Sequence, residues 1–128
     1  MRILIDADVV YWAVDSPSKL SAQAIAAVQS PANELLLSVG TIWEMAIKVG
    51  LGKLTLSLPF LQWMTQAIAD LDLTVLPVTV EYADMQSRLP RHHGDPFDRL
   101  LVAQAQTEQM PLISTDSVFD LYGVNRIW

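Results

Sequence analysis

Short apolar runs alternate with longer stretches of helical periodicity along this chain. The runs Arg2–Ile5, Leu35–Ser38, Leu73–Leu76 and Leu112–Ser114 predict buried strands, and a last strand is predicted near Arg126–Ile127. Helices are predicted over Val9–Val14, Ala22–Gln29, Val39–Val49, Pro59–Asp70, Thr79–Leu89, Asp95–Gln109 and Val118–Leu121. Strands alternating with helices favour a three-layer α/β/α sandwich around a central, mostly parallel sheet of four to five strands.

Several helix ends carry capping signals. Asp95 followed by Pro96 predicts an N-cap and first helical residue. Asp8 is expected to cap the first helix, and Ser21 the second. Thr41 to Glu44 fits a capping box, and Gly50 and Gly52 are expected as left-handed ends of that same helix.

Composition favours one soluble domain spanning residues 1–128. The chain has no cysteine and no apolar run of about 18 residues, and Asp6 comes too early for a signal peptide, so a cytoplasmic protein without a membrane segment is expected. Its hydrophobic content is 52%, which exceeds the need of one small core and suggests a protein interface. Four tryptophans are candidates for that interface or for the core: Trp12, Trp43, Trp63 and Trp128.

Four acids far apart in sequence are expected at one edge of the sheet. Asp6 and Asp116 end strands, Asp98 begins a helix, and Glu44 lies one turn into another. Each has a local alternative as a cap, a turn residue or, for Glu44, a partner of Lys48. Carboxylates about 4 Å apart repel by roughly 4 kcal/mol at an effective dielectric of about 20, so such a cluster needs a cation. Oxygen ligands without cysteine favour Mg²⁺ or Mn²⁺ and point to hydrolysis of a phosphodiester.

The same residues resemble a known family. The segments that carry the resemblance are Ile3–Asp6, Ser38 with Ile42–Lys48, Leu51–Leu54, Arg91–Leu101, Leu112–Asp116 and Tyr122–Trp128. Together they look like the PIN domain, and more narrowly like toxin ribonucleases of the VapC type, nearly from end to end. The Trp-Glu and Asp-Pro-Phe-Asp-Arg segments in this order and spacing are the specific part.

The resemblance implies a metal-dependent endoribonuclease that is held silent by an antitoxin, in a type II toxin–antitoxin pair. It places metal-binding, catalytic acids at the four positions already singled out: Asp6, Glu44, Asp98 and Asp116. Asp95 and Ser114 would support the site. The chain departs from the family at Ala7 and Asp8, where relatives usually carry a hydroxyl residue and then His or Asn. Asp8 either adds charge for metal binding or caps a helix, and the cap is favoured.

Basic residues are scarce: the chain has 8 lysines and arginines against 14 acids, which gives a net charge of −6 and a pI of about 4.6. Candidates to contact RNA phosphates are Arg99, Lys48, Lys53, Arg88 and Arg91. Arg99 is equally a candidate to orient Asp95 or Glu44. His92 and His93 are expected as exposed loop residues outside the site. The expected partners are an RNA substrate, a cognate antitoxin lying near Trp12, Ile42–Trp43 and Leu51, and a second copy in a homodimer.

Two other functions fit parts of the sequence. Asp6-Ala7-Asp8 after a buried strand looks like the nucleophile motif of a haloacid-dehalogenase-type phosphatase, but that reading leaves Glu44 and Asp116 unexplained. A non-catalytic module that binds nucleic acid or protein would keep the acids for stability alone. Replacement of Asp98 separates these readings, because a cap and a metal ligand have opposite effects on the metal-free stability.

Overall fold

A computed structural model describes residues 1–128 and contains one five-stranded sheet. The strands are β1 (Arg2–Ile5), β2 (Glu34–Ser38), β3 (Leu73–Leu76), β4 (Leu112–Ile113) and β5 (Arg126–Ile127). Their order across the sheet is β3-β2-β1-β4-β5, and every neighbouring pair is parallel. The predicted parallel α/β/α architecture is therefore confirmed, with β1 at the centre.

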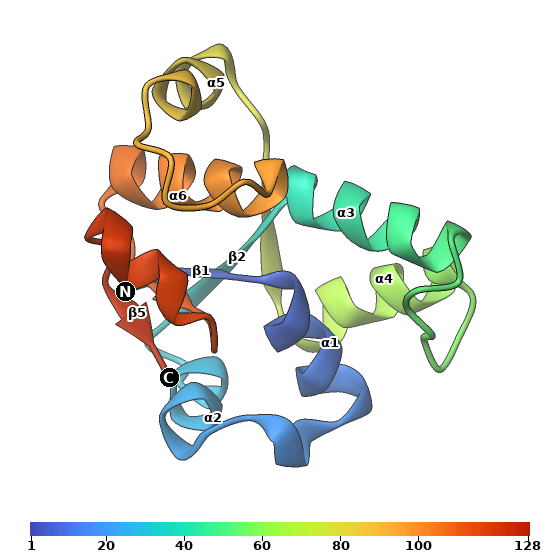
Figure 1. Ribbon diagram of the computed structural model, residues 1–128. Coiled ribbons are helices and arrows are strands. Elements are labelled where there is room, and N and C mark those ends of the chain that lie inside the picture. The colour runs from blue at the N-terminus through green and yellow to red at the C-terminus, as the bar shows by residue number, and fades with distance from the viewer.

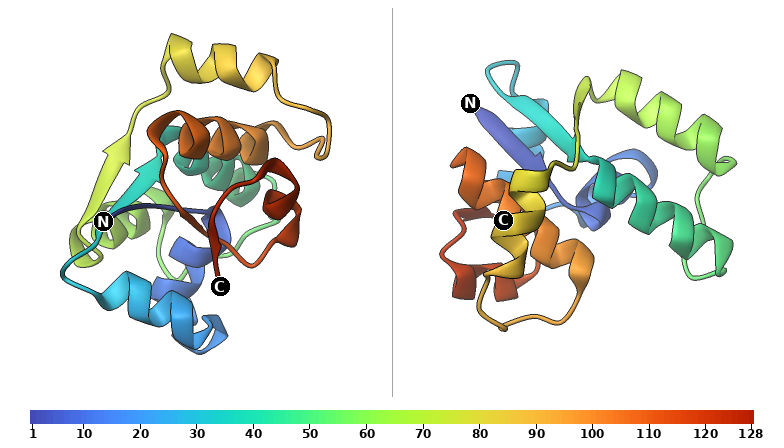
Figure 2. Two further views of the ribbon diagram at one scale, coloured as in Figure 1. Left: turned by 90° about the vertical axis from the view of Figure 1, so that its left-hand side faces the viewer. Right: turned by 90° about the horizontal axis from the view of Figure 1, so that it is seen from above.

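Helices cover both faces of the sheet (Figures 1 and 2). They are α1 (Ala7–Asp15), α2 (Ala22–Gln29), α3 (Val39–Gly50), α4 (Phe60–Asp70), α5 (Val80–Ser87) and α6 (Pro96–Glu108), with 3₁₀ turns η1 (Pro17–Lys19) and η2 (Ser117–Tyr122). Figure 1 shows α5 and α6 above the sheet and α1 and α2 below it. No helix combines the length and the apolar character needed to cross a membrane.

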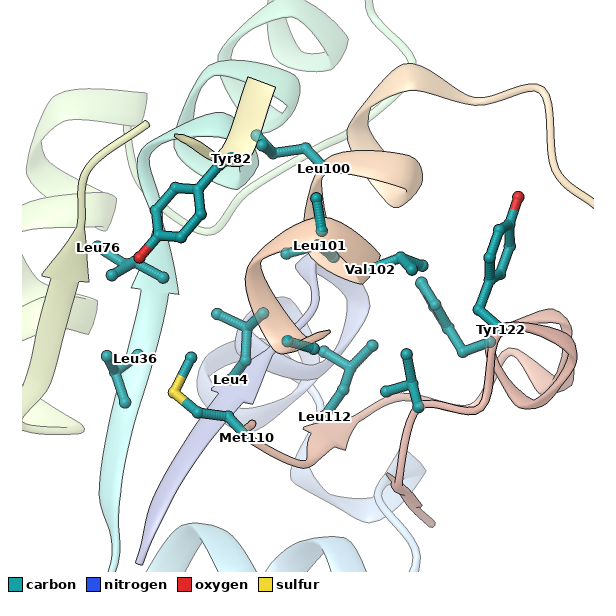
Figure 3. Close-up of a cluster of buried hydrophobic side chains, with 14 of the residues drawn as sticks. Leu4, Leu36, Leu76, Tyr82, Leu100, Leu101, Val102, Met110, Leu112 and Tyr122 are labelled. Atoms are coloured by element: carbon teal, nitrogen blue, oxygen red, sulfur yellow. The ribbon is translucent and has the colours of Figure 1, made fainter. Parts of the chain in front are cut away.

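The period of two along each strand divides the core into two clusters. Leu4, Leu36 and Leu112 pack on the α5 and α6 side, as Figure 3 shows, whereas Ile3 and Ile113 pack on the side of α1 and α4. All five side chains are essentially inaccessible to solvent. Burial of such a side chain contributes about 1.5–3 kcal/mol to the stability of the fold. A shift of β1 by one residue would move each of its side chains to the opposite face, so burial on both faces determines its register.

Two predicted caps are wrong because helices begin directly at strand ends. Asp6, not Asp8, caps α1: its Oδ1 accepts the Val9 N–H at 3.1 Å. Ser38 caps α3, and its Oγ accepts the Gly40 N–H at 3.1 Å, so the capping box expected at Thr41 does not form.

The other predicted ends agree with the structure, apart from one glycine. Ser21 caps α2 and Asp95 caps α6, with Pro96 as its first residue. Gly52 has a φ of +72°, as expected for a left-handed residue, whereas Gly50 is the last helical residue of α3 and Leu51 is its C-cap.

The first turns of α3 and α6 approach each other closely. A Cβ atom built on Gly40 would overlap Cδ2 of the buried Leu100 side chain, so any other residue at this position would force Leu100 to shift. Figure 1 shows the two helix starts side by side above the sheet. This contact brings Glu44, one turn after Gly40 on α3, and Asp98, two residues before Leu100 on α6, toward one edge.

Candidate metal centre

A strongly acidic cleft of about 110 Å³ lies at the carboxyl edge of the sheet. Nine residues line it, of which six are acids and one is a lysine: Asp6, Ala7, Asp8, Glu44, Lys48, Asp95, Asp98, Asp116 and Phe119. All four acids expected at this edge are therefore brought together. The parallel topology does this, because strand ends and the helix starts that follow them share one rim.

Each of the four acids is placed by a strand end or a helix start. Asp6 follows β1 and Asp116 follows β4, and each caps the helical segment that comes next. Asp98 lies in the first turn of α6 and Glu44 in the second turn of α3. Capping and clustering are thus not alternatives here, since Asp6 and Asp116 do both.

One oxygen of each acid is held by a donor from the protein. The contacts are Asp6 Oδ1 with Val9 N–H at 3.1 Å, Glu44 Oε2 with Lys48 Nζ at 3.0 Å, Asp98 Oδ2 with His93 Nε2 at 2.9 Å, and Asp116 Oδ1 with Val118 N–H at 3.0 Å. Glu44 Oε1 and Asp98 Oδ1 have no protein donor. The carboxylates of the site are therefore held in place by the protein, and some of their oxygens remain available to bind a ligand.

Burial makes the ionised form of two acids unfavourable. The pKa of Asp6 is raised to about 7, mainly by burial, against the lowering effect of hydrogen bonds from Ser114 and Val9. The pKa of Asp98 is raised to about 6 by burial and by the charges of Asp95 and Glu44. A bound cation would relieve both the desolvation and the repulsion.

Lys48 is the single lysine of the cleft, and its positive charge does not balance the negative charge of the six acids there. Its Nζ lies 3.0 Å from Glu44, which raises the pKa of Lys48, so it stays charged. The remaining donors are carboxylate oxygens, the ligand type that Mg²⁺ and Mn²⁺ prefer. The residues present therefore fit a hard divalent cation.

Asp95 and Ser114 lie where a supporting role requires them. Asp95 Oδ1 accepts the N–H groups of Phe97 and Asp98 at 2.8 and 3.2 Å, which fixes the start of α6. Ser114 is fully buried, and its Oγ accepts the Asp116 N–H at 3.0 Å. Both residues thus orient the acids that follow them in sequence.

Arg99 does not orient Asp95 or Glu44, and it does not face the cleft. It is buried and donates to the carbonyl oxygens of Gln86, Leu89 and Pro90 and to the hydroxyl of Tyr122. Its role as a phosphate contact or an acid-orienting residue was predicted from sequence proximity and is wrong. The side chain runs back from α6 and ties down the segment that follows α5.

His93 belongs to the site, contrary to the expectation that both histidines lie outside it. His92 is exposed and its ring stacks edge-on against Tyr122, with ring centres 5.0 Å apart. His93 is half-buried, with Nε2 at 2.9 Å from Asp98 and 3.9 Å from Asp116. Residue type alone does not distinguish the two adjacent histidines. The signal that could have identified His93 is its position two residues before Asp95, the N-cap of α6.

The other charged candidates surround the cleft unevenly. Asp8 is exposed and lines the cleft, so its charge adds to the site even though it caps nothing. Arg88 pairs with Asp84 at 3.0 Å, whereas Lys53 and Arg91 are exposed without an ion pair. Lys48 is thus the one predicted phosphate contact inside the cleft.

One of the four tryptophans is well exposed. Trp63 is buried, Trp12 and Trp128 pack against each other with ring centres 6.0 Å apart, and Trp43 is 65% exposed. Trp43 lies beside Phe97 at the rim of an apolar hollow of about 310 Å³. One exposed apolar surface is therefore formed by Trp43 and Phe97, which lie on the same two helices as Glu44 and Asp98.

Comparison with known proteins matches nearly the whole chain to one family. The model of the PIN domain family matches residues 3–125. A curated relative, Ribonuclease VapC22 of Mycobacterium tuberculosis, is 32% identical over 115 residues, which cover 89% of this chain and 86% of the relative.

Solved structures share the fold at low sequence identity. A chain of VapBC2 from Rickettsia felis, bound to a DNA fragment from its promoter, aligns over 100% of both chains with a TM-score of 0.68 and 14% identity. The toxin–antitoxin system VapBC-5 from Mycobacterium tuberculosis aligns over 98% of this chain and 94% of its own, with a TM-score of 0.61 and 20% identity.

Proposed function

Because this chain belongs to the PIN domain family, we propose that it is a metal-dependent endoribonuclease and the toxin of a type II toxin–antitoxin pair. The observation that carries the proposal is the cleft in which Asp6, Glu44, Asp98 and Asp116 meet a single lysine. A phosphatase of the haloacid dehalogenase type is not supported, because the chain matches the PIN domain family. That function would also leave Glu44 on α3 and Asp116 after β4 unexplained, although both line the cleft.

The proposed cofactor is Mg²⁺, with Mn²⁺ as a substitute. Asp6, Glu44, Asp98 and Asp116 would hold it through carboxylate oxygens. A bound Mg²⁺ would make water a stronger nucleophile and would stabilise the charge that develops on the leaving oxygen. Hydrolysis would leave 5′-phosphate and 3′-hydroxyl ends.

The chain's own residues prepare the site for that reaction. Capping and ion-pair contacts hold each carboxylate in one orientation before the cation arrives, which limits the reorganisation on binding. Lys48 lines the same cleft and is the residue we expect to contact a substrate phosphate. Lys53 and Arg91, both exposed, would extend this contact along the RNA.

Two protein partners are part of the proposal. One is a cognate antitoxin, since the relatives with solved structures are toxin–antitoxin complexes. The other is a second copy of this chain, packed on the apolar surface around Trp43 and Phe97, so Trp43 is reassigned from the antitoxin surface expected from the sequence to the dimer. Sedimentation equilibrium would test the dimer: Trp43→Ser should shift the purified chain to monomer, and Trp12→Ser should not.

Cleavage of labelled single-stranded RNA by the purified, partner-free chain tests the activity. We expect cutting with Mg²⁺ and Mn²⁺, none with EDTA, and a loss of at least about 100-fold in Asp6→Asn and Asp98→Asn. Asp70→Asn, an exposed acid at the end of α4, is the matched control and should cut like the wild type.

Either of two results would contradict this function. Equal cutting by Asp6→Asn and the wild type would assign the activity to a contaminant. A folded wild-type chain that binds RNA but leaves it intact with every metal would favour the non-catalytic binding module.

A further inference from the structure

We propose that His93 is a positioning residue of this centre, donating a hydrogen bond to Asp98 from Nε2 and remaining outside the coordination sphere of the metal. The inference rests on the proposed function, since it concerns the same cation. Distance alone does not exclude coordination, because one ligand-type atom each from His93, Asp98 and Asp116 lies within 4.8 Å of the other two. The hydrogen bonds of the ring decide between the two roles.

The tautomer of His93 is set by the backbone. The Asp95 N–H donates to Nδ1 of His93 at 2.9 Å, so Nδ1 uses its lone pair as an acceptor and carries no proton. A neutral imidazole then carries its proton on Nε2. That nitrogen lies 2.9 Å from Asp98 Oδ2, in position to donate.

A protonated Nε2 has no lone pair for a metal ion. Coordination through Nε2 would require the proton to move to Nδ1, where it would face the Asp95 N–H at hydrogen-bond distance. Release of that N–H from Nδ1 would disturb the residue that caps α6. The cost of an unpaired, partly buried N–H opposes this rearrangement.

The loop that carries His93 is anchored from behind. The Tyr122 hydroxyl accepts the N–H groups of His92 and His93 at 3.2 and 2.9 Å. Arg99 donates to the same hydroxyl at 3.3 Å and to the Pro90 carbonyl at 2.9 Å. The ring of His93 is therefore presented to Asp98 by a fixed backbone, which explains why a buried arginine lies so close to an acidic site without facing it.

This arrangement leaves the donor set of the cation all-oxygen. His93 contacts Oδ2 of Asp98, so Oδ1, which has no protein donor, is the oxygen left for the metal. The imidazole fixes the plane of the carboxylate, as outer-shell partners of metal ligands do. Without a nitrogen ligand, the site should favour hard cations over Zn²⁺.

The first test observes the tautomer directly. Two-bond ¹H–¹⁵N correlation spectra of the full chain, labelled in its two histidines, identify which ring nitrogen carries the proton, and His92→Gln assigns the signals. We expect His93 in the Nε2–H form before and after saturation with Mg²⁺. A change to the Nδ1–H form on adding Mg²⁺, or a ¹⁴N coupling of His93 to Mn²⁺ in pulsed electron paramagnetic resonance, would overturn the inference.

The second test compares two variants by Mn²⁺ binding, measured by electron paramagnetic resonance of the free ion. His93→Gln keeps an N–H donor at the place of Nε2, whereas His93→Leu removes it. We expect His93→Gln to bind within about 3-fold of the wild type and His93→Leu at least about 10-fold more weakly. His92→Gln is the matched control and should bind like the wild type. Equal losses in His93→Gln and His93→Leu, or no loss in His93→Leu, would contradict a positioning role.

The tautomer of His93 and the Mn²⁺ affinities of its variants can be measured whether or not the chain cuts RNA. If the wild type binds Mn²⁺ but cuts no RNA, the ribonuclease proposal fails while the tautomer and the variant series still decide the role of His93. If the wild type cuts RNA and His93 shows ¹⁴N coupling, only the inference on His93 fails.

Discussion

At the scale of single residues, Arg99 is buried beside the acidic cleft and does not face it. It follows Asp98 directly, yet consecutive helical residues point about 100° apart, and its side chain runs away from the cleft. Its charge is satisfied by three carbonyl oxygens and a hydroxyl, without any carboxylate partner. It therefore acts on the site only through the loop that it anchors.

Replacement of Arg99 should lower the stability of the fold and should not remove a direct contact with RNA. Arg99→Met leaves buried carbonyl groups unpaired, so we expect a loss of about 2–4 kcal/mol in the free energy of unfolding, measured in urea. Arg91→Met, an exposed arginine without an ion pair, should change stability by less than about 0.5 kcal/mol. Full stability of Arg99→Met combined with weaker RNA binding would restore the phosphate-contact role.

At the scale of elements, the site depends on the junctions between strands and helices. β1 and β4 are followed by acids, Asp6 and Asp116, that cap the next helical segment. The starts of α3 and α6 lie close enough to bring Glu44 and Asp98 to the same edge. At position 40 the absence of a Cβ leaves room for the side chain of Leu100 on α6. This contact is therefore where packing and the geometry of the cleft are coupled.

Gly40→Ala should disturb that contact. The new Cβ would overlap the buried Leu100 side chain, so we expect a loss of about 1–3 kcal/mol in stability and weaker Mg²⁺ binding. Gly50→Ala, on the same helix with open space around it, should be neutral or up to about 1 kcal/mol more stable. Thermal unfolding with and without Mg²⁺ measures both effects, and equal behaviour of the two variants would show that α3 and α6 can separate freely.

At the scale of the whole molecule, the acidic cleft destabilises the metal-free fold, because two buried carboxyl groups resist ionisation. The folded-state pKa values of Asp6 and Asp98, about 7 and about 6, lie above their unfolded value of 3.8. The folded chain thus binds more protons than the unfolded chain between about pH 4 and pH 7. In that window the stability of the metal-free protein falls as the pH rises.

Unfolding in urea with EDTA at pH 5 and pH 7.5 should show this fall. Asp6→Asn, which keeps an oxygen for the Val9 N–H, should flatten it and be about 2–4 kcal/mol more stable than the wild type at pH 7.5. Mg²⁺ should stabilise the wild type more at pH 7.5 than at pH 5, because protons compete for the same oxygens. Asp70→Asn should keep the wild-type slope, and a slope unchanged by Asp6→Asn would place the titrating groups elsewhere.

The sequence by itself determined the layers, the strands and the meeting of the four acids. Apolar periodicity marks β1 to β5, and the alternation of strand and helix dictates a parallel sheet whose carboxyl edge collects Asp6, Glu44, Asp98 and Asp116. These features follow from local patterns and from one topological rule. The differences are the 3₁₀ turn η1, which was not predicted, and shifted element ends, as at Asp8, because Asp6 directly after β1 is itself the cap of α1.

The tertiary structure decided which way neighbouring side chains face. His93 faces Asp98 while its loop is held by hydrogen bonds to Asp95 and Tyr122, and Arg99 faces away because carbonyl groups in and after α5 accept its hydrogen bonds. Such partners are distant in sequence or lie on the backbone, and no spacing rule encodes them. The cluster of acids could thus be predicted from the chain, whereas the contact between His93 and Asp98 emerged only from the packed fold.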